Sequence, residues 1–239
     1  MRILALDTAS GPIAVAVVDT RGGDPVVRRE PAGRGQAERL PGLVAEALAA
    51  AGLAPADLDR IVVTTGPGGF TGVRVGVAYA RGLALALAVP AIGVTSFAAL
   101  AASVRAAVGD RPVTVVLDDR RGGVHVQAFS PAGEPAGAWA TTTPAAAAAA
   151  LAPGGVLAGP GAVAVEAAGA AAGAVLADAA VDPVVLARLG AAAVPDGAPE
   201  PLYLRPADAI PAAPSRLLAE PRPEAPPRPA RPVSEGGEQ

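Results

Sequence analysis

The sequence contains no cysteine and no lysine among its 239 residues, and only one histidine, His125. Without cysteine there are no disulfides and no thiolate metal sites, and one histidine cannot supply a two-histidine metal site or a Ser-His-Asp triad. Without lysine the chain lacks the Lys-Ser/Thr pair that closes a P-loop. All nineteen basic residues are therefore arginine, and with the abundant alanine this bias indicates genomic composition rather than function.

Aromatic residues and long hydrophobic runs are scarce too. Aromatics make up 3% of the chain, so aliphatic side chains must build the core. The apolar run at residues 83–94 is broken by Pro90 and falls short of the ~20 residues that span a membrane. Residues 3–6 are too few for a secretory signal, and Asp7 interrupts them. A net charge of −3 argues against strong nucleic-acid binding by this chain alone. We expect a soluble cytoplasmic protein.

Hydrophobic patterning predicts an α/β fold built from two similar halves. In the first half the expected elements are strands at 2–7, 13–18, 26–30, 61–64 and 91–94 and helices at 38–51, 72–88 and 96–108. A second strand-turn-strand occupies 113–129, and placing Asp118 on Asp7 aligns it with the first hairpin. After it we expect helices at 145–151, 163–172 and 184–189 and a strand at 156–158.

These patterns divide the chain into three parts. Residues 1–108 are expected to form an N-terminal lobe and residues 109–212 a C-terminal lobe of the same fold. Residues 213–239 are rich in proline and arginine and have almost no apolar periodicity, which predicts a disordered tail from about Pro214.

The segment Gly66-Pro67-Gly68-Gly69-Phe70-Thr71-Gly72-Val73-Arg74 joins a strand to a long helix. Glycines at such a turn permit positive φ and close approach, and a helix start attracts negative charge. However, neither of two known phosphate-binding motifs, the dinucleotide-binding fingerprint and the P-loop, fits this segment. The spacing of Gly66, Gly68 and Gly72 is one residue too long for G-x-G-x-x-G, and the P-loop lysine is missing.

The helix that follows carries small residues along one stripe, because Gly72, Gly76 and Ala80 recur every four residues. A glycine inside a helix costs about 1 kcal/mol relative to alanine, so two on one stripe predict close backbone approach to another element. That element is either this chain's own sheet or a helix of another protein, and the spacing favours neither. Arg74 and Arg81 share a different face.

Two strand ends carry acidic residues with more than one interpretation. Asp7 and Thr8 follow the first strand, where the carboxylate would either serve a nucleotide or metal site or accept hydrogen bonds within the turn. Asp118-Asp119-Arg120-Arg121 follows the equivalent strand, where the carboxylates would bind a cation, act in acid–base chemistry or form a structural ion-pair turn. His125 is expected to be a surface residue of a strand.

Several of these segments together resemble the TsaB family of bacterial tRNA threonylcarbamoyladenosine biosynthesis. The resemblance is carried by Gly66–Gly76 with Ala80–Ala84, Ile3–Ala9, Ala37–Pro41, Ile92–Ser96, Val116–Arg121, and Pro201–Arg205 with Asp208. It extends over most of residues 1–130, but within 150–210 it is limited to short separate segments. Three positions depart from the family pattern: Gln36 stands where histidine is frequent, Pro160 where asparagine is common, and a tyrosine usual near His125 is absent.

The resemblance implies a duplicated, two-lobed actin-like (ASKHA, ribonuclease H-like) fold with mixed sheets, and a non-catalytic scaffold and activating subunit. The implied partners are a TsaD-like catalytic homologue and a TsaE-like ATPase, with tRNA bound only through the complex and no membrane. A homodimer through the same surface is the alternative state of the chain alone. No cofactor of its own is implied, while ATP or ADP would bind at the complex interface.

The resemblance also assigns candidate residues. The partner interface is expected on two helices, at Leu40, Leu43, Ala47, Gly72, Val73, Gly76, Tyr79, Ala80 and Leu83. A nucleotide or structural site is expected at Asp7, Thr8, Gly68, Gly69 and Asp118, with no catalytic residue and no metal ligand. The rival functions are an active enzyme of the same fold (a threonylcarbamoyl transferase or small-molecule kinase) and a glycoprotease-like peptidase.

Overall fold

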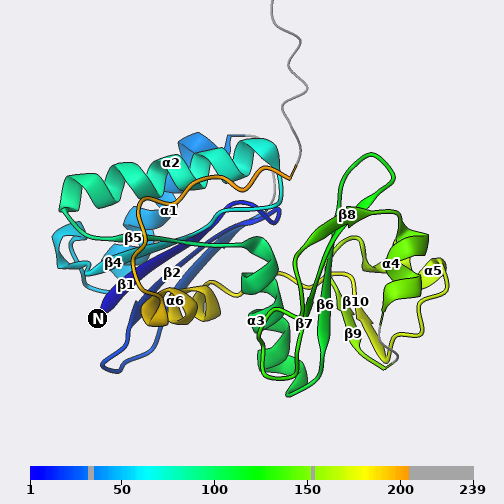
Figure 1. The fold of residues 1–239 in the computed structure, drawn as a ribbon. Coiled ribbons are helices and arrows are strands. Elements are labelled where there is room, and N and C mark those ends of the chain that lie inside the picture. The colour runs from blue at the N-terminus through cyan, green and yellow to red at the C-terminus, as the bar shows by residue number, and fades with distance from the viewer. Residues whose placement is uncertain (32–34, 152–153, 205–239) are drawn as a thin grey trace, which may run out of the picture. The chain divides into compact units, whose positions relative to one another are not determined.

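The computed structural model describes residues 1–31, 35–151 and 154–204 and contains two five-stranded mixed sheets with flanking helices (Figure 1). The predicted tail at 213–239, and Arg205 and Asp208 of the closing motif, lie outside the described residues. The described part forms one compact unit up to Leu204.

The first sheet has the strand order β3-β2-β1-β4-β5. Its strands are β1 (Arg2–Asp7), β2 (Ile13–Asp19), β3 (Val26–Glu30), β4 (Arg60–Thr64) and β5 (Ala91–Val94). Strands β1, β2 and β3 are antiparallel, with Leu4 opposite Val17, and β4 and β5 run parallel to β1. The central strand β1 therefore joins an antiparallel half and a parallel half.

The second sheet repeats this topology. Its order is β10-β9-β6-β7-β8, with β6 (Val113–Asp118), β7 (Val124–Phe129), β8 (Ala140–Thr142), β9 (Val156–Ala158) and β10 (Ala174–Leu176). Again three strands are antiparallel, and two run parallel to the first. The duplicated α/β fold predicted from the aligned hairpins is confirmed.

Helices lie between and outside the sheets. They are α1 (Gln36–Ala50), α2 (Phe70–Leu87), α3 (Ser96–Val108), α4 (Pro144–Ala150), α5 (Ala162–Ala167) and α6 (Pro183–Ala192), with a short 3₁₀ turn, η1, at Pro55–Asp57. By length and mean hydropathy (1.2), α2 is the one helix in the described ranges that could cross a membrane. One side of it is buried against the first sheet, as in a core helix (Figure 1).

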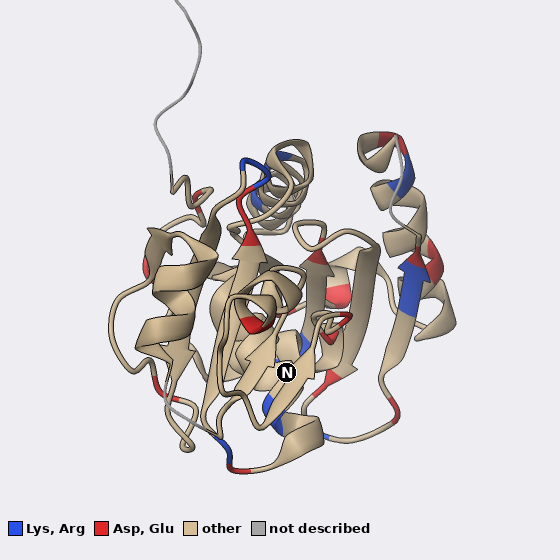
Figure 2. Cartoon of the chain, turned by 90° about the vertical axis from the view of Figure 1, so that its right-hand side faces the viewer, with Lys and Arg blue, Asp and Glu red and all other residues tan. Residues whose placement is uncertain are grey.

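Side chains of β1 alternate between two cores, which explains why this strand is almost wholly apolar. Leu4 and Leu6 pack in a core with α1 and α2, whereas Ile3 and Ala5 pack in a second core on the opposite face. Covered on both faces, the strand reads as a continuous apolar run. Figure 2 shows that the strands carry little charge except at their ends, with β3 as the clearest exception, and that the remaining charge lies in turns and on helices.

The last helix of each half packs on the sheet of the other half. Helix α6 lies against β1, β2, β4 and β5, while α3 packs on β6, β7 and β9. A Cβ added to Gly190 of α6 would overlap the side chain of Val62 on β4, so the helix approaches the sheet very closely. Residues 183–192, which we expected within the C-terminal lobe at 109–212, therefore pack on the first sheet, and residues 96–108 pack on the second.

The structure differs from the predicted elements in a few places. The strands β8 and β10 were not predicted, and each has only three residues. The helix expected over 163–172 ends at Ala167, because Gly169 adopts a positive φ of 99°. Helix α2 starts at Phe70, two residues earlier than expected.

Candidate functional site

The glycine loop before α2 is fastened to the turn between β1 and β2. The Gly69 amide donates a hydrogen bond of 2.9 Å to the Ala9 carbonyl oxygen. A Cβ added to Gly68 would overlap that same oxygen. Gly68 is therefore required by close approach of the chain to itself, and one amide of the loop is already used within the protein.

The small-residue stripe of α2 accommodates the same turn. Thr8 Oγ1 donates a buried hydrogen bond of 2.7 Å to the Gly72 carbonyl oxygen. A Cβ at Gly72 would overlap the Thr8 carbonyl oxygen, and one at Gly76 would overlap Thr8 Oγ1. Of the two interpretations left open by the spacing, close packing on the chain's own turn is the one that the structure contains.

This packing places most of the expected interface residues in the chain's own core. The side chains that pack in the core between the helix pair and the first sheet are Leu40, Leu43, Ala47, Val73 and Ala80, and Gly72 and Gly76 are buried beside them. Tyr79 and Leu83 are partly buried against the same core. The apolar side of each helix thus covers the chain's own sheet, and which residues of the helix pair meet a partner stays a prediction.

The opposite side of the helix pair is exposed, and beside its charged side chains it carries a set of small and apolar residues. These are Gly42, Ala45 and Ala49 on α1 and Ala78, Gly82, Leu85 and Ala86 on α2, and we call them the outer face. Leu85 is 85% exposed. A Cβ at Gly42 or Gly82 would have no atom within 4 Å, so these glycines leave room for close approach from outside.

Asp7 is a buried carboxyl with partners from two elements. It is 2% exposed, and its Oδ1 accepts hydrogen bonds from Thr64 Oγ1 at 2.6 Å and from the Ala9 amide at 3.0 Å. Burial raises its pKa above the ordinary value, although the hydrogen bonds act in the opposite direction. These contacts tie the ends of β1 and β4 together and match the structural interpretation of this residue.

The acidic cluster of the second lobe serves a turn. Asp118 Oδ1 accepts from the Arg120 amide at 2.7 Å, and Asp119 Oδ1 accepts from the amides of Arg121 and Gly123 at 2.7 and 2.8 Å. An Asp carboxylate that accepts a hydrogen bond from the amide two residues on, as both do here, is typical of turns. Asp118 itself is exposed, whereas Asp7, its counterpart in the first lobe, is buried.

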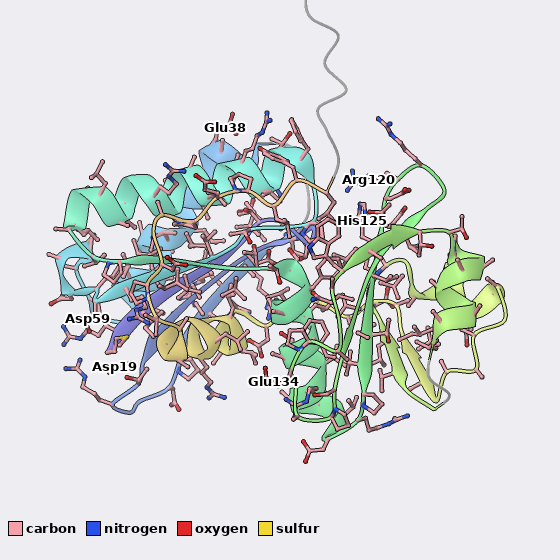
Figure 3. All side chains as sticks on the ribbon, viewed as in Figure 1. Asp19, Glu38, Asp59, Arg120, His125 and Glu134 are labelled. Carbon is pink, nitrogen blue, oxygen red and sulfur yellow. The ribbon has the colours of Figure 1, made fainter. Side chains whose placement is uncertain are left out.

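His125 lies on β7, in the same hairpin as Arg120 (Figure 3). Its Nδ1 is 2.8 Å from Thr141 Oγ1 on the neighbouring strand β8, and the ring is buried. The expectation of a surface histidine was wrong, because β8 was not predicted and it covers this position.

One group of functional candidates was missed by sequence reasoning. Arg74 stacks over the Phe70 ring, with its Cζ 3.6 Å from the ring centroid, and its Nε donates a 2.7 Å hydrogen bond to Tyr203 Oη. The Phe70 and Tyr203 ring centroids are 6.1 Å apart. Tyr203 is more than a hundred residues from its partners, so no local pattern could have linked them.

Comparison with known proteins shows the family to which the chain belongs. The family model of TsaD, tRNA N6-adenosine threonylcarbamoyltransferase, matches residues 26–185. The tRNA threonylcarbamoyladenosine biosynthesis proteins TsaB of Escherichia coli and Bacillus subtilis are 34% and 35% identical over 125 and 127 residues. The chain belongs to the TsaB family. Its match to the TsaD model also makes it a homologue of TsaD.

The solved structures extend this match over nearly the whole described fold. A crystal structure from Pseudomonas aeruginosa, described as similar to the peptidase YeaZ, superposes with a TM-score of 0.76 at 30% identity. It covers 85% of this TsaB-family chain and 99% of its own. The two named TsaB sequences match 52% of this chain and 53% of their own length, so the chain spans about half the length of these curated relatives.

The matched region bears on the site of this TsaB-family protein. Residues 26–185 include both α1 and α2, and therefore the whole outer face. They include neither Asp7 nor Tyr203. The helix pair thus belongs to the part that this protein has in common with TsaD.

Proposed function

We propose that this protein is a non-catalytic scaffold and activating subunit in tRNA threonylcarbamoyladenosine biosynthesis. It pairs with a TsaD-like catalytic homologue through the outer face of α1 and α2. The observation that carries the proposal is this exposed, glycine- and alanine-rich face on a chain of the TsaB family. Small side chains allow helices of two proteins to approach closely, which suits a four-helix contact.

The non-catalytic role is supported by the residues themselves. Asp7, which stands where an enzyme of this fold would hold its nucleotide, is buried and bonded to Thr64 and Ala9. The chain has a single histidine, His125, so it cannot supply a two-histidine metal site. A subunit of this kind contributes by positioning its catalytic partner, not by supplying reacting groups.

The remaining components follow from this role. A TsaE-like ATPase acts with the pair, tRNA binds through the complex, and any ATP or ADP binds at the complex interface. The net charge of −3 supports a minor part for this chain alone in binding tRNA. We place the complex in the cytoplasm, where tRNA is modified, and a homodimer through the same face is its alternative when the partner is absent.

The decisive experiment is co-purification with the TsaD homologue of the same organism. Leu85→Arg puts a long charged side chain on the outer face at a position where little can be lost from the core. Val194→Arg is the matched control, since Val194 is also 85% exposed but lies beyond α6. We expect Leu85→Arg to abolish co-purification and Val194→Arg to leave it unchanged. Equal retention of both variants would refute the interface.

A substitution on the buried stripe would be a poor test. Gly76→Leu would overlap Thr8 and disturb the fold of α2 before any partner is met. The rival function, an active enzyme, is tested separately by assaying the isolated protein for ATP turnover and threonylcarbamoyl transfer. Activity that depends on Asp7 would overturn the scaffold proposal.

A further inference from the structure

Helix α2 carries charge of one sign. Its charged residues are Arg74 and Arg81, and it contains no aspartate or glutamate. Both arginines are exposed, and neither takes part in the ion pairs found among residues 1–31, 35–151 and 154–204. Seven residues make almost two full turns, so the two side chains lie along one stripe about 10 Å apart. This stripe borders the outer face.

Arg74 is held in place before any partner binds. Its guanidinium lies over Phe70, and its Nε is bonded to Tyr203 Oη, while Phe70 and Tyr203 are 59% and 50% exposed. Ordering a long arginine on binding normally costs conformational entropy. Here part of that ordering exists in the free protein, so the terminal nitrogens of Arg74 are presented at a defined position.

The C-terminal segment 193–204, which we call the strap, brings Tyr203 to this position. It runs from α6 to the start of α2 (Figure 1). The Leu202 amide donates a 2.8 Å hydrogen bond to the Thr65 carbonyl oxygen just before the glycine loop. Pro199 packs over Gly93, where a Cβ would lie 3.0 Å from its ring. The strap is therefore fastened at two points before it reaches Arg74.

We infer that Arg74 and Arg81, with Phe70 and Tyr203, form an anchor that selects a partner helix bearing two acidic side chains seven residues apart. Tyr203, at the far end of the strap from Val194, is thereby part of the partner-binding surface. This inference rests on the proposed function and names the chemistry of the partner. Exposed aromatic and arginine side chains are the residue types that most often dominate protein interfaces, and a preorganised guanidinium binds a carboxylate with two hydrogen bonds.

The positive charge of α2 makes a second copy of this chain a poorer partner for the outer face than the TsaD homologue. If α2 of one copy packed against α2 of another, arginines would face arginines, which disfavours that pairing. The exposed acidic residues of α1, Glu38 and Glu46, are eight residues apart and so lie about 80° apart around the helix. Figure 3 shows Glu38 on the side of the helix pair away from the sheet. They do not form a stripe that matches Arg74 and Arg81.

The test measures affinity for the TsaD homologue by titration calorimetry with the full-length chain. Arg74→Gln and Arg81→Gln remove one charge each, and Tyr203→Phe removes only the hydroxyl that bonds Arg74. Arg188→Gln on α6 is the control with the same charge change at another exposed position. Circular dichroism and thermal melting check that every variant is folded.

We expect each α2 variant to weaken binding at least about tenfold and to flatten its dependence on salt, because a charge pair is lost. Tyr203→Phe should weaken binding less, and Arg188→Gln should not change it. If Leu85→Arg abolishes binding but both arginine variants bind like wild type, the anchor is refuted and the proposed function stands. If Leu85→Arg also binds normally, the interface itself is wrong.

A third outcome concerns RNA. If the arginine variants keep their affinity for the homologue but reduce tRNA binding by the assembled complex, the cluster contacts nucleic acid, and the anchor is overturned. Filter binding of labelled tRNA to complexes made with each variant measures this directly.

Discussion

Three glycines of α2 should respond in opposite ways to the same substitution. Gly72 and Gly76 face Thr8, whereas Gly82 has no atom within 4 Å of a Cβ position. Alanine stabilises a helix interior by about 1 kcal/mol relative to glycine. Gly82→Ala should therefore raise the free energy of unfolding by up to about 1 kcal/mol.

Replacing either of the buried glycines, Gly72 or Gly76, by alanine should lower the free energy of unfolding. At Gly72 the added Cβ overlaps the Thr8 carbonyl oxygen and lies 2.9 Å from Gln36 Oε1, so backbone must shift. Overpacking costs about 1–3 kcal/mol, and losing the Thr8–Gly72 hydrogen bond adds about 1 kcal/mol. The higher helix propensity of alanine offsets part of this loss. At Gly76 the obstacle is the Thr8 hydroxyl, a side-chain atom, so we expect a smaller loss of about 0–2 kcal/mol.

Urea unfolding of the isolated chain, followed by circular dichroism at two protein concentrations, measures the three variants. The expected order of stability is Gly82→Ala, wild type, Gly76→Ala, Gly72→Ala. For a domain of this size 1 kcal/mol corresponds to about 2–4 °C in Tm. If Gly72→Ala were as stable as Gly82→Ala, the stripe would not be packed on Thr8, and its assignment to a partner interface would return.

Two other regions give predictions of their own. Burial raises the pKa of Asp7, so the stability due to its protonated form is complete below about pH 4 and is lost as the pH rises through the folded pKa. Asp7→Asn cannot lose a proton here, so its free energy of unfolding should not fall in this way when urea unfolding is measured between about pH 4 and 8. A pH profile identical to that of wild type would contradict this prediction. Gly190→Ala should destabilise the protein by about 1–3 kcal/mol, because its Cβ overlaps Val62; thermal melting checks this, and an unchanged Tm would mean that α6 is not seated against β4. Arg60→Met should reduce the free energy of unfolding by a similar amount, since Arg60 Nη1 donates to three carbonyl oxygens at the end of α6. Thermal melting measures this as well, and a melting curve like that of wild type would rule out a stabilising role for Arg60.

Sequence patterns located the central elements well, for identifiable reasons. The strands β1, β3, β5 and β9 and the helix α3 have the predicted bounds, because apolar runs and glycine or proline boundaries are local signals. The strands β8 and β10 were missed because three residues carry no periodicity. Their pairing partners on β7 and β9 determine that they are strands.

The candidate site was predicted in part. The glycine loop and the two helices were identified as the region of interest, and the resemblance to TsaB has been confirmed. The sequence could not decide which side of α2 is buried, because a small-residue stripe looks the same whether it meets the chain's own turn or another protein. That the helix pair binds a partner stays a prediction.

The amino-acid sequence by itself determined the order of most strands and helices, the duplication and the family, since these depend on spacing within short windows and on motifs read along the chain. Tertiary structure alone decided that α3 and α6 each cover the other half's sheet, that Thr8 occupies the glycine stripe, and that Tyr203 holds Arg74. Each of these contacts joins residues far apart in the chain. Their formation depends on how whole faces pack together, which no local pattern encodes.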